Sequence, residues 1–185
     1  MKLARACVPA DAISDAELLR SIAAGEIGAL GALYDRHHGS LRRFLTRASA
    51  GADDVDDLVH ATFLSAAKSA ARYDGRISCR PWLFGIAVRL LQRRRVSFAR
   101  LLRAIASLRA RPSSIDPRDR LEARKDVERA LARLSEAKRV TFVMAEVEGL
   151  SCAEIAEALD VPVGTVWGRL HAARRELRRA LEGTP

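Results

Sequence analysis

The spacing of apolar residues constrains this 185-residue chain more than any other feature. Leu30, Leu33, His37 and Leu41 illustrate a core-type pattern that recurs every three or four positions along most of the chain. This is the period of an amphipathic α-helix. Apolar residues make up 49% of the chain and aromatic residues only 5%, with Ala, Leu and Arg abundant. Because this composition favours helices over strands and suffices for a core, the sequence predicts an all-α fold.

Four helices are predicted in the first 111 residues, and the second is the one just described. The first begins where Ser14 and Glu17 have capping-box spacing. The acidic run 53–57 would stabilise the start of the third, because negative charge is favoured at a helix N-terminus. Pro81 suits the first turn of the fourth, and a basic amphipathic stretch at 98–111 either extends that helix or forms a separate short one. The apolar face of the third helix is predicted to contain Leu58, Phe63, Leu64 and Ala67.

The clearest interruption of the helical pattern lies at residues 111–117. Pro112 and Pro117 flank two serines there, and each proline disfavours the helical conformation of the residue before it. The sequence therefore predicts two small helical domains joined by a Pro/Ser linker. We expect an N-terminal tail at 1–14, a helical domain at 15–111, the linker at 112–118 and a second helical domain at 119–185.

The second domain is predicted to contain a helix-turn-helix. Ser151 and Glu154 repeat the capping-box spacing, a short helix follows, and residues 160–164 suit a tight turn. The last helix would pack through apolar residues and present a basic face. In this motif the second helix reads base edges in the major groove while arginines fix phosphates. The candidate DNA-binding residues on it are Thr165, Trp167, Arg169, His171, Arg174 and Arg175.

Arg169 is the favoured base-reading residue, because a guanidinium group can bond O6 and N7 of guanine together. Trp167 has two interpretations: contact with a thymine methyl group, or packing within the domain. A helical hairpin with a solvated face is the alternative to the whole motif. Five arginines against one acidic residue between positions 169 and 179 argue against that alternative.

Positive charge is concentrated in the first domain. Residues 1–111 hold 19 Lys and Arg against 10 Asp and Glu, whereas residues 112–185 hold 13 of each. Ten arginines and no acidic residue occur between positions 75 and 115. Such a stretch repels itself and needs an external anion; nucleic-acid phosphate is the leading candidate, with an anionic membrane surface or an acidic protein as alternatives. The candidate contacts in this stretch are Arg80, Arg89, Arg93, Arg94 and Arg95.

Several classes of function lack their sequence signals. Three widely spaced cysteines and four histidines form no metal-binding motif, so we expect no disulfide framework, no metal site and no cofactor. There is no P-loop, dinucleotide-binding pattern or Ser/His/Asp signature, which argues against an enzyme. No apolar run suits a membrane span or a signal peptide. These observations predict a cytoplasmic protein without membrane insertion.

Motifs in both domains resemble a known family. The run Glu146-Val147-Glu148-Gly149-Leu150-Ser151 and the segment Val161-Pro162-Val163-Gly164-Thr165-Val166 resemble the −35-binding domain of bacterial sigma factors of the extracytoplasmic-function group. Asp56-Asp57-Leu58-Val59-His60 resembles that group's polymerase-binding helix. Arg80-Pro81-Trp82-Leu83-Phe84-Gly85 resembles the helix that leads into its −10-reading segment. The resemblance covers roughly residues 15–181.

Three residue pairs depart from the family's usual pattern. His60-Ala61 replaces a polar–acidic pair, Val88-Arg89 stands where Arg-Asn is common, and Trp167-Gly168 stands where Lys/Arg-Ser is common. The resemblance therefore implies a basic −10-binding surface rather than individual −10 contacts. It implies polymerase contacts through Asp56, Asp57, Val59 and His60.

The resemblance implies a subunit that binds RNA polymerase core and promoter DNA and directs transcription initiation. It also implies restraint by an anti-sigma factor. Polymerase would perform the chemistry, and this chain would contribute binding energy. The alternative is a stand-alone helix-turn-helix repressor or activator, which accounts for the second domain but leaves the motifs of the first unexplained.

Overall fold

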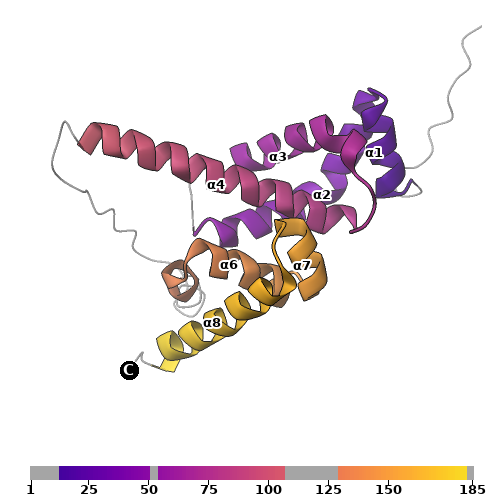
Figure 1. Cartoon of the computed structure of the whole chain (residues 1–185). Helices are drawn as coiled ribbons and strands as arrows, with labels where there is room; N and C mark the ends of the chain where they lie inside the picture. The colour runs from indigo at the N-terminus through magenta and orange to yellow at the C-terminus, as the bar shows by residue number, and fades with distance from the viewer. Residues whose placement is uncertain (1–12, 51–53, 107–128, 183–185) are drawn as a thin grey trace, which may run out of the picture.

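The computed structural model describes residues 13–50, 54–106 and 129–182, and within these ranges all regular structure is helical (Figure 1). The predicted all-α fold is confirmed. The predicted linker at 112–118 lies outside the described residues, as does most of the predicted tail. The elements are α1 (Asp15–Ala23), α2 (Ile27–Ala48), α3 (Val55–Ser69), the 3-10 turn η2 (Ala70–Arg72), α4 (Cys79–Ala106), α6 (Glu136–Phe142), the π-helical turn η3 (Val143–Val147), α7 (Cys152–Leu159) and α8 (Val163–Glu182).

Both predicted capping boxes are present. The Ser14 hydroxyl accepts from the Glu17 amide at 3.3 Å, and the Glu17 carboxylate accepts from the Ser14 amide at 2.9 Å. Ser151 and Glu154 make the same pair of bonds at 3.2 and 2.9 Å. Hydrogen bonds from serine hold the pKa of both Glu17 and Glu154 below the ordinary value of 4.5. These reciprocal bonds determine where α1 and α7 begin.

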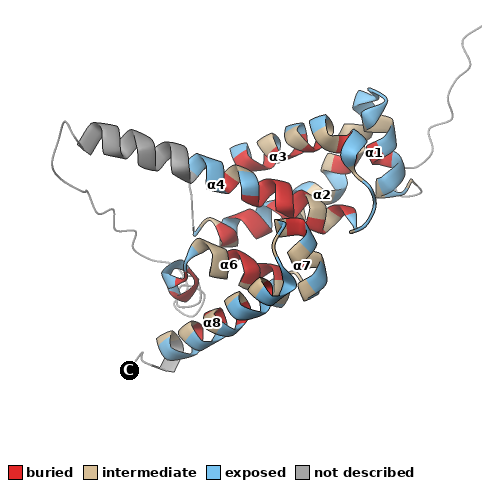
Figure 2. Ribbon diagram, viewed as in Figure 1, coloured by how far each residue is buried: buried red, intermediate tan, exposed pale blue. Residues whose placement is uncertain are grey.

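The first lobe, residues 13–106, is centred on the contact of α2, α3 and α4, where buried residues concentrate (Figure 2). Phe44 of α2 and Phe84 of α4 stack with ring centroids 4.3 Å apart. Leu33, Leu41 and Leu83 are at most 1% exposed around them. α4 continues to Ala106, so residues 98–106 of the predicted basic stretch extend the fourth helix.

The predicted apolar face of α3 was wrong at one position. Leu64 is 60% exposed, whereas the buried face contains Leu58 and Phe63 together with Thr62. Thr62 can occupy the core because its hydroxyl donates to the Leu58 carbonyl at 2.6 Å. Leu64 follows Phe63 by one position, which turns it about 100° around the helix axis and towards solvent.

The second lobe, residues 129–182, packs α8 across α6 and α7. The predicted inward residues of α8 are buried: Val166, Leu170, Ala173 and Leu177 are at most 9% exposed. Its preceding helix contains the π-helical turn η3, which ends where the Glu148 amide donates to the Val143 carbonyl at 3.0 Å. Such a turn inserts an extra residue into the helix, and Val147 at its end is 44% exposed.

The two lobes share one contiguous core. It joins Leu83 and Val88 of α4 to Val140 of α6 and Ile155 of α7. At Gly85 the backbones of α4 and α7 come so close that an added Cβ would lie 2.2 Å from the carbonyl oxygen of Ala158. Only glycine permits that approach. None of the helices within the described ranges has both the length and the apolar run needed to cross a bilayer.

The Arg139 side chain is a polar link across this lobe contact. It is 3% exposed, and its Nε donates to the carbonyl of Ala48, at the end of α2, at 2.8 Å. Nη1 donates to the Leu134 carbonyl at 3.1 Å. The buried guanidinium therefore bonds to carbonyls of both lobes, in accordance with the rule that a buried charge is retained where it is hydrogen-bonded.

Candidate nucleic-acid interface

The helix-turn-helix is formed by α7, residues 160–162 and α8. Asp160 ends α7 in the left-handed conformation with φ of 53°. The next amide, of Val161, donates back to the Ala156 carbonyl at 3.0 Å. This closes the short helix tightly, so that α8 begins at Val163. Burial of Val166 and Leu170 then turns the opposite face of α8 outward.

The predicted DNA-binding residues of α8 divide into two groups. Trp167, His171 and Arg175 are exposed and recur every four residues along one side of α8. Trp167 is 66% exposed, so it is not packed inside the lobe. Arg174 is exposed too, but its guanidinium pairs with Glu146 at 2.5 Å. Thr165 and Arg169 are half-buried.

Arg169 and Arg89 come together between the lobes. Both line a cavity of about 160 Å³ whose other walls include Gly85 and Val161. Arg89 also reaches the carbonyl oxygen of Ala158 in α7, at 3.4 Å. Residues assigned from sequence to two different promoter elements thus line the same cavity between the lobes.

Arg80 is engaged by the second lobe as well. It forms an ion pair with Glu148, whose side chain is only 6% exposed. The Arg80 guanidinium also lies 5.4 Å from the ring centroid of Phe84. A nearly buried carboxylate requires a partner of this kind. In this arrangement Arg80 therefore contributes to the contact between the lobes.

A basic groove runs between α3 and α4 in the first lobe. Its volume is about 430 Å³. Sequence reasoning identified two of its residues, Arg89 and Arg93, but missed the contribution of α3 and η2. The signal available was the spacing of Lys68 and Arg72, four residues apart, which places both on one side of a helix. We call this the α3–α4 groove; its lining residues are Ser65, Lys68, Ser69, Arg72, Trp82, Ile86, Arg89, Leu90 and Arg93.

The remaining residues of the predicted arginine run have separate environments. Arg94 forms an ion pair with Asp54, just before α3. The side chain of Arg95 lies outside the described residues. Trp82, which sequence reasoning placed in a motif without a role, is half-buried in the α3–α4 groove and packs edge-on against Tyr73, with centroids 5.2 Å apart.

The predicted polymerase-binding residues lie at the start of α3. Asp56, Asp57 and His60 are exposed, but Val59 is 3% exposed and packs in the core. Val59 cannot present its side chain to a partner, because it occupies the buried side of α3 next to Leu58. Asp56 accepts from Arg42 of α2 at 2.8 Å, so the two helices form one polar surface there.

An aromatic stack adjoins this surface and was missed from the sequence. Tyr34 of α2 stacks on His38, with ring centroids 5.0 Å apart, and on His60 of α3, at 5.8 Å. Phe63 packs beneath Tyr34 at 4.8 Å. Since Phe63 is buried, the stack anchors exposed His38 and His60 to the core.

Two family models match this chain, one in each lobe. The model described as Sigma-70 region 2 matches residues 33–97, and the model described as Sigma-70, region 4 matches residues 124–177. The first contains Asp56, Asp57 and His60 together with the α3–α4 groove, and the second contains the helix-turn-helix. A stand-alone helix-turn-helix regulator is therefore not favoured, because it would not explain the region 2 match.

Curated relatives cover almost the whole chain. The ECF RNA polymerase sigma factor SigM of Mycobacterium tuberculosis is 37% identical over 174 residues, spanning 91% of this chain and 85% of that protein. The ECF sigma factor SigL of the same species is 34% identical over 166 residues, spanning 86% and 93%. These alignments therefore extend across both lobes of the chain.

Solved structures share the fold. The sigma factor RpoE from Bartonella quintana, crystallised with the anti-sigma factor NepR, superposes with a TM-score of 0.68 at 22% identity, covering 82% of this chain and 96% of that one. CnrH, solved with the cytosolic domain of CnrY, gives 0.66 at 25% identity, covering 92% and 99%. With both family models matched in order along the chain and SigM 37% identical across most of both proteins, the chain belongs to the ECF RNA polymerase sigma factors, which direct promoter recognition.

Proposed function

We propose that the two lobes of this sigma factor divide promoter recognition between the outward face of α8 and the α3–α4 groove. The face of α8 would enter the major groove of the −35 duplex, and the α3–α4 groove would take the melted −10 strand. The observation that carries the proposal is the α3–α4 groove itself, which combines a half-buried tryptophan with basic side chains from two helices.

The composition of the groove suits single-stranded DNA. Proteins that bind single strands combine basic side chains that follow the phosphates with aromatic rings on which bases stack. Lys68, Arg72 and Arg93 supply the charge, and Trp82 supplies a ring held in place by Tyr73. Duplex DNA would use the rings less, because its bases are already stacked on one another.

The face of α8 suits duplex DNA. Trp167 and His171 lie in its first half, where the recognition helix of a helix-turn-helix meets base edges. Arg169 would join them once the lobes separate, since it now lines the cavity between the lobes. Arg175, Arg178 and Arg179 would contact phosphates further along the helix, and they are exposed.

The polymerase-binding surface proposed here comprises Asp56, Asp57 and His60, with Tyr34 and His38 alongside. All five lie on α2 or α3, and the ring stack restrains three of them. We propose that the chain acts in the cytoplasm by binding alone, with catalysis left to polymerase. An anti-sigma factor is the further partner we propose, by analogy with the complex of RpoE and the anti-sigma factor NepR.

Reconstituted holoenzyme tests the groove directly. The double variant Lys68→Gln/Arg72→Gln should weaken binding to a single-stranded −10 probe regardless of its sequence. The salt slope should fall by about 0.7 for each lost phosphate contact. The matched control is Arg20→Gln/Arg43→Gln, which removes two exposed charges outside the groove. Equal behaviour of the two double variants would show that the groove does not take the −10 strand.

A further inference from the structure

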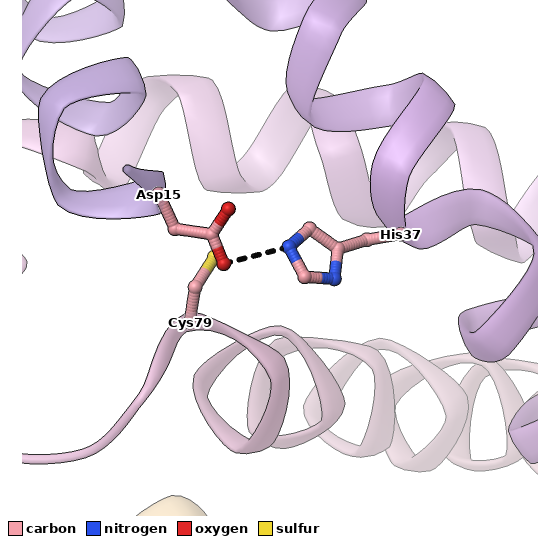
Figure 3. A group of neighbouring side chains, drawn as sticks. All are labelled: Asp15, His37 and Cys79. Atoms are coloured by element: carbon pink, nitrogen blue, oxygen red, sulfur yellow. Dashed lines mark hydrogen bonds and ion pairs between the residues drawn. The ribbon is translucent and has the colours of Figure 1, made fainter. Parts of the chain in front are cut away.

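Three side chains far apart in the sequence converge in the first lobe (Figure 3). They are Asp15 at the start of α1, His37 in the middle of α2 and Cys79 at the start of α4. One carboxylate oxygen, one imidazole nitrogen and the thiol sulfur all lie within 4.8 Å of one another. Cys79 is buried, and the other two are half-buried. Three helices thus bring three potential metal ligands to one point.

The donor set has the chemistry of a zinc site. Thiolate, imidazole and carboxylate are the three side-chain ligands that Zn²⁺ uses, at bond lengths of about 2.0–2.3 Å. In a tetrahedron those lengths separate ligand atoms by roughly 3.3–3.8 Å. The present separations, up to 4.8 Å, lie close enough for side-chain adjustment to reach them. A hard cation such as Mg²⁺ prefers oxygen ligands and would be a poor match.

The contacts that Asp15, His37 and Cys79 already make would allow a metal ion to bind. The Asp15 carboxylate uses one oxygen to accept from Arg36 at 2.5 Å and the other to contact Nε2 of His37 at 2.8 Å. No hydrogen bond engages Sγ of Cys79 among the described residues. A bound ion would replace the Asp15–His37 contact with two metal bonds and give the thiolate a partner.

We propose that Asp15, His37 and Cys79 form a site for a zinc-class divalent cation that joins α1, α2 and α4. Water would supply a fourth ligand. The ion would hold the first turn of α4 in place, and with it the backbone of Arg80 and Trp82. This inference stands apart from promoter recognition, because none of the three residues lines the α3–α4 groove or belongs to α8.

Burial of Cys79 bears on how the metal would be loaded. Loss of hydration, reinforced by the Asp15 charge, raises the pKa of the thiol to about 12. Without metal the thiol is protonated at neutral pH and a poor nucleophile. As for any cysteine ligand, the thiol must give up this proton when it binds the ion.

The test uses the full-length chain, stripped with a chelator and then titrated with Zn²⁺, Co²⁺ or Mg²⁺. We expect about one Zn²⁺ retained per chain, a rise in thermal midpoint on loading, and a thiolate-to-metal absorption band with Co²⁺. Cys79→Ala should abolish the band, and His37→Gln should weaken zinc binding by at least about tenfold. Glutamine retains a donor for Asp15, which helps preserve the fold of this variant.

Matched controls separate the cluster from other ligands. Cys152→Ala removes the other cysteine that the structure describes, and His38→Gln removes the histidine next in sequence to His37. Both should bind zinc like the unmodified chain. Arg36→Gln should tighten zinc binding, because it removes a cation that competes for Asp15. The proposal is overturned if no zinc is retained, or if Cys79→Ala and His37→Gln retain it like the controls.

Discussion

Gly85→Ala tests the close packing of the two lobes. The added methyl carbon would lie 2.2 Å from the Ala158 carbonyl oxygen and 3.1 Å from its carbon. Contacts below 3.0 Å essentially never occur for a real Cβ, so the helices must separate by at least about 0.8 Å. Neither Gly85 in α4 nor Ala158 in α7 can adjust alone, because the clash is with backbone.

The control for this substitution is Gly31→Ala. Gly31 is exposed inside α2, and an added Cβ there would meet nothing within 4 Å. Alanine inside a helix is more stable than glycine by about 0.5–1 kcal/mol, so the control should gain this amount. For a chain of this length, that gain corresponds to a rise of roughly 1–4 °C in thermal midpoint.

Gly85→Ala should behave in the opposite way. Overpacking typically costs about 1–3 kcal/mol, which outweighs the helix gain, unless the lobes separate to relieve it. Separation would break the Arg80–Glu148 ion pair and further expose Arg169, which is half-buried against the first lobe. Calorimetry and small-angle X-ray scattering should show a lower midpoint or a larger radius of gyration. The reasoning fails if Gly85→Ala matches Gly31→Ala in both measurements.

Two further predictions concern local structure. Phe63→Ala should cost about 3–5 kcal/mol of folding free energy, since Phe63 is 3% exposed. Asp57→Ala, at an exposed position, should leave thermal stability nearly unchanged and weaken binding to core polymerase. Equal loss of thermal stability in the two variants would mean that Asp57 only stabilises the start of α3. Ser151→Ala should cost about 1 kcal/mol at neutral pH. The folded-state pKa of Glu154 is lowered, so the stability that Glu154 contributes is present above pH 4.5 and is lost as pH falls through the folded pKa. Ser151→Ala should therefore lose less stability on acidification than the unmodified chain. Chemical denaturation at pH 7 and at acidic pH measures both effects, and identical acid losses in the variant and the unmodified chain would refute the capping role.

The helices could be predicted because their signals are local. Ser14 and Glu17, or Ser151 and Glu154, lie three residues apart, so the sequence displays the whole capping interaction. The buried stripe of α8 follows from a single period of 3.6 residues. Local signals did not predict which residues of α3 are buried. Leu64 is apolar like its neighbours, and only contacts with other helices determine that Thr62 is buried and Leu64 is exposed.

The sites were less predictable because they depend on contacts between distant segments. Lys68 and Trp82 line one groove, but nothing in the sequence pairs α3 with α4 at that register. Gly85 meets Ala158 across 73 positions, and a lone glycine inside a helix gives no sign of its partner. Asp15, His37 and Cys79 have no metal-binding spacing at all, and their proximity depends on three helices packing together.

Reading of the −35 element by α8 is the central claim about specificity, and Arg169 tests it most directly. The measurement is transcription by core polymerase with the unmodified chain or Arg169→Ala, on a promoter library randomised through the −35 element. A bidentate guanidinium–guanine contact discriminates by about 1–3 kcal/mol. Arg169→Ala should therefore lose base preference at one −35 position and retain it elsewhere. A uniform decrease in transcription with every base preference intact would contradict the account and make Arg169 a phosphate contact.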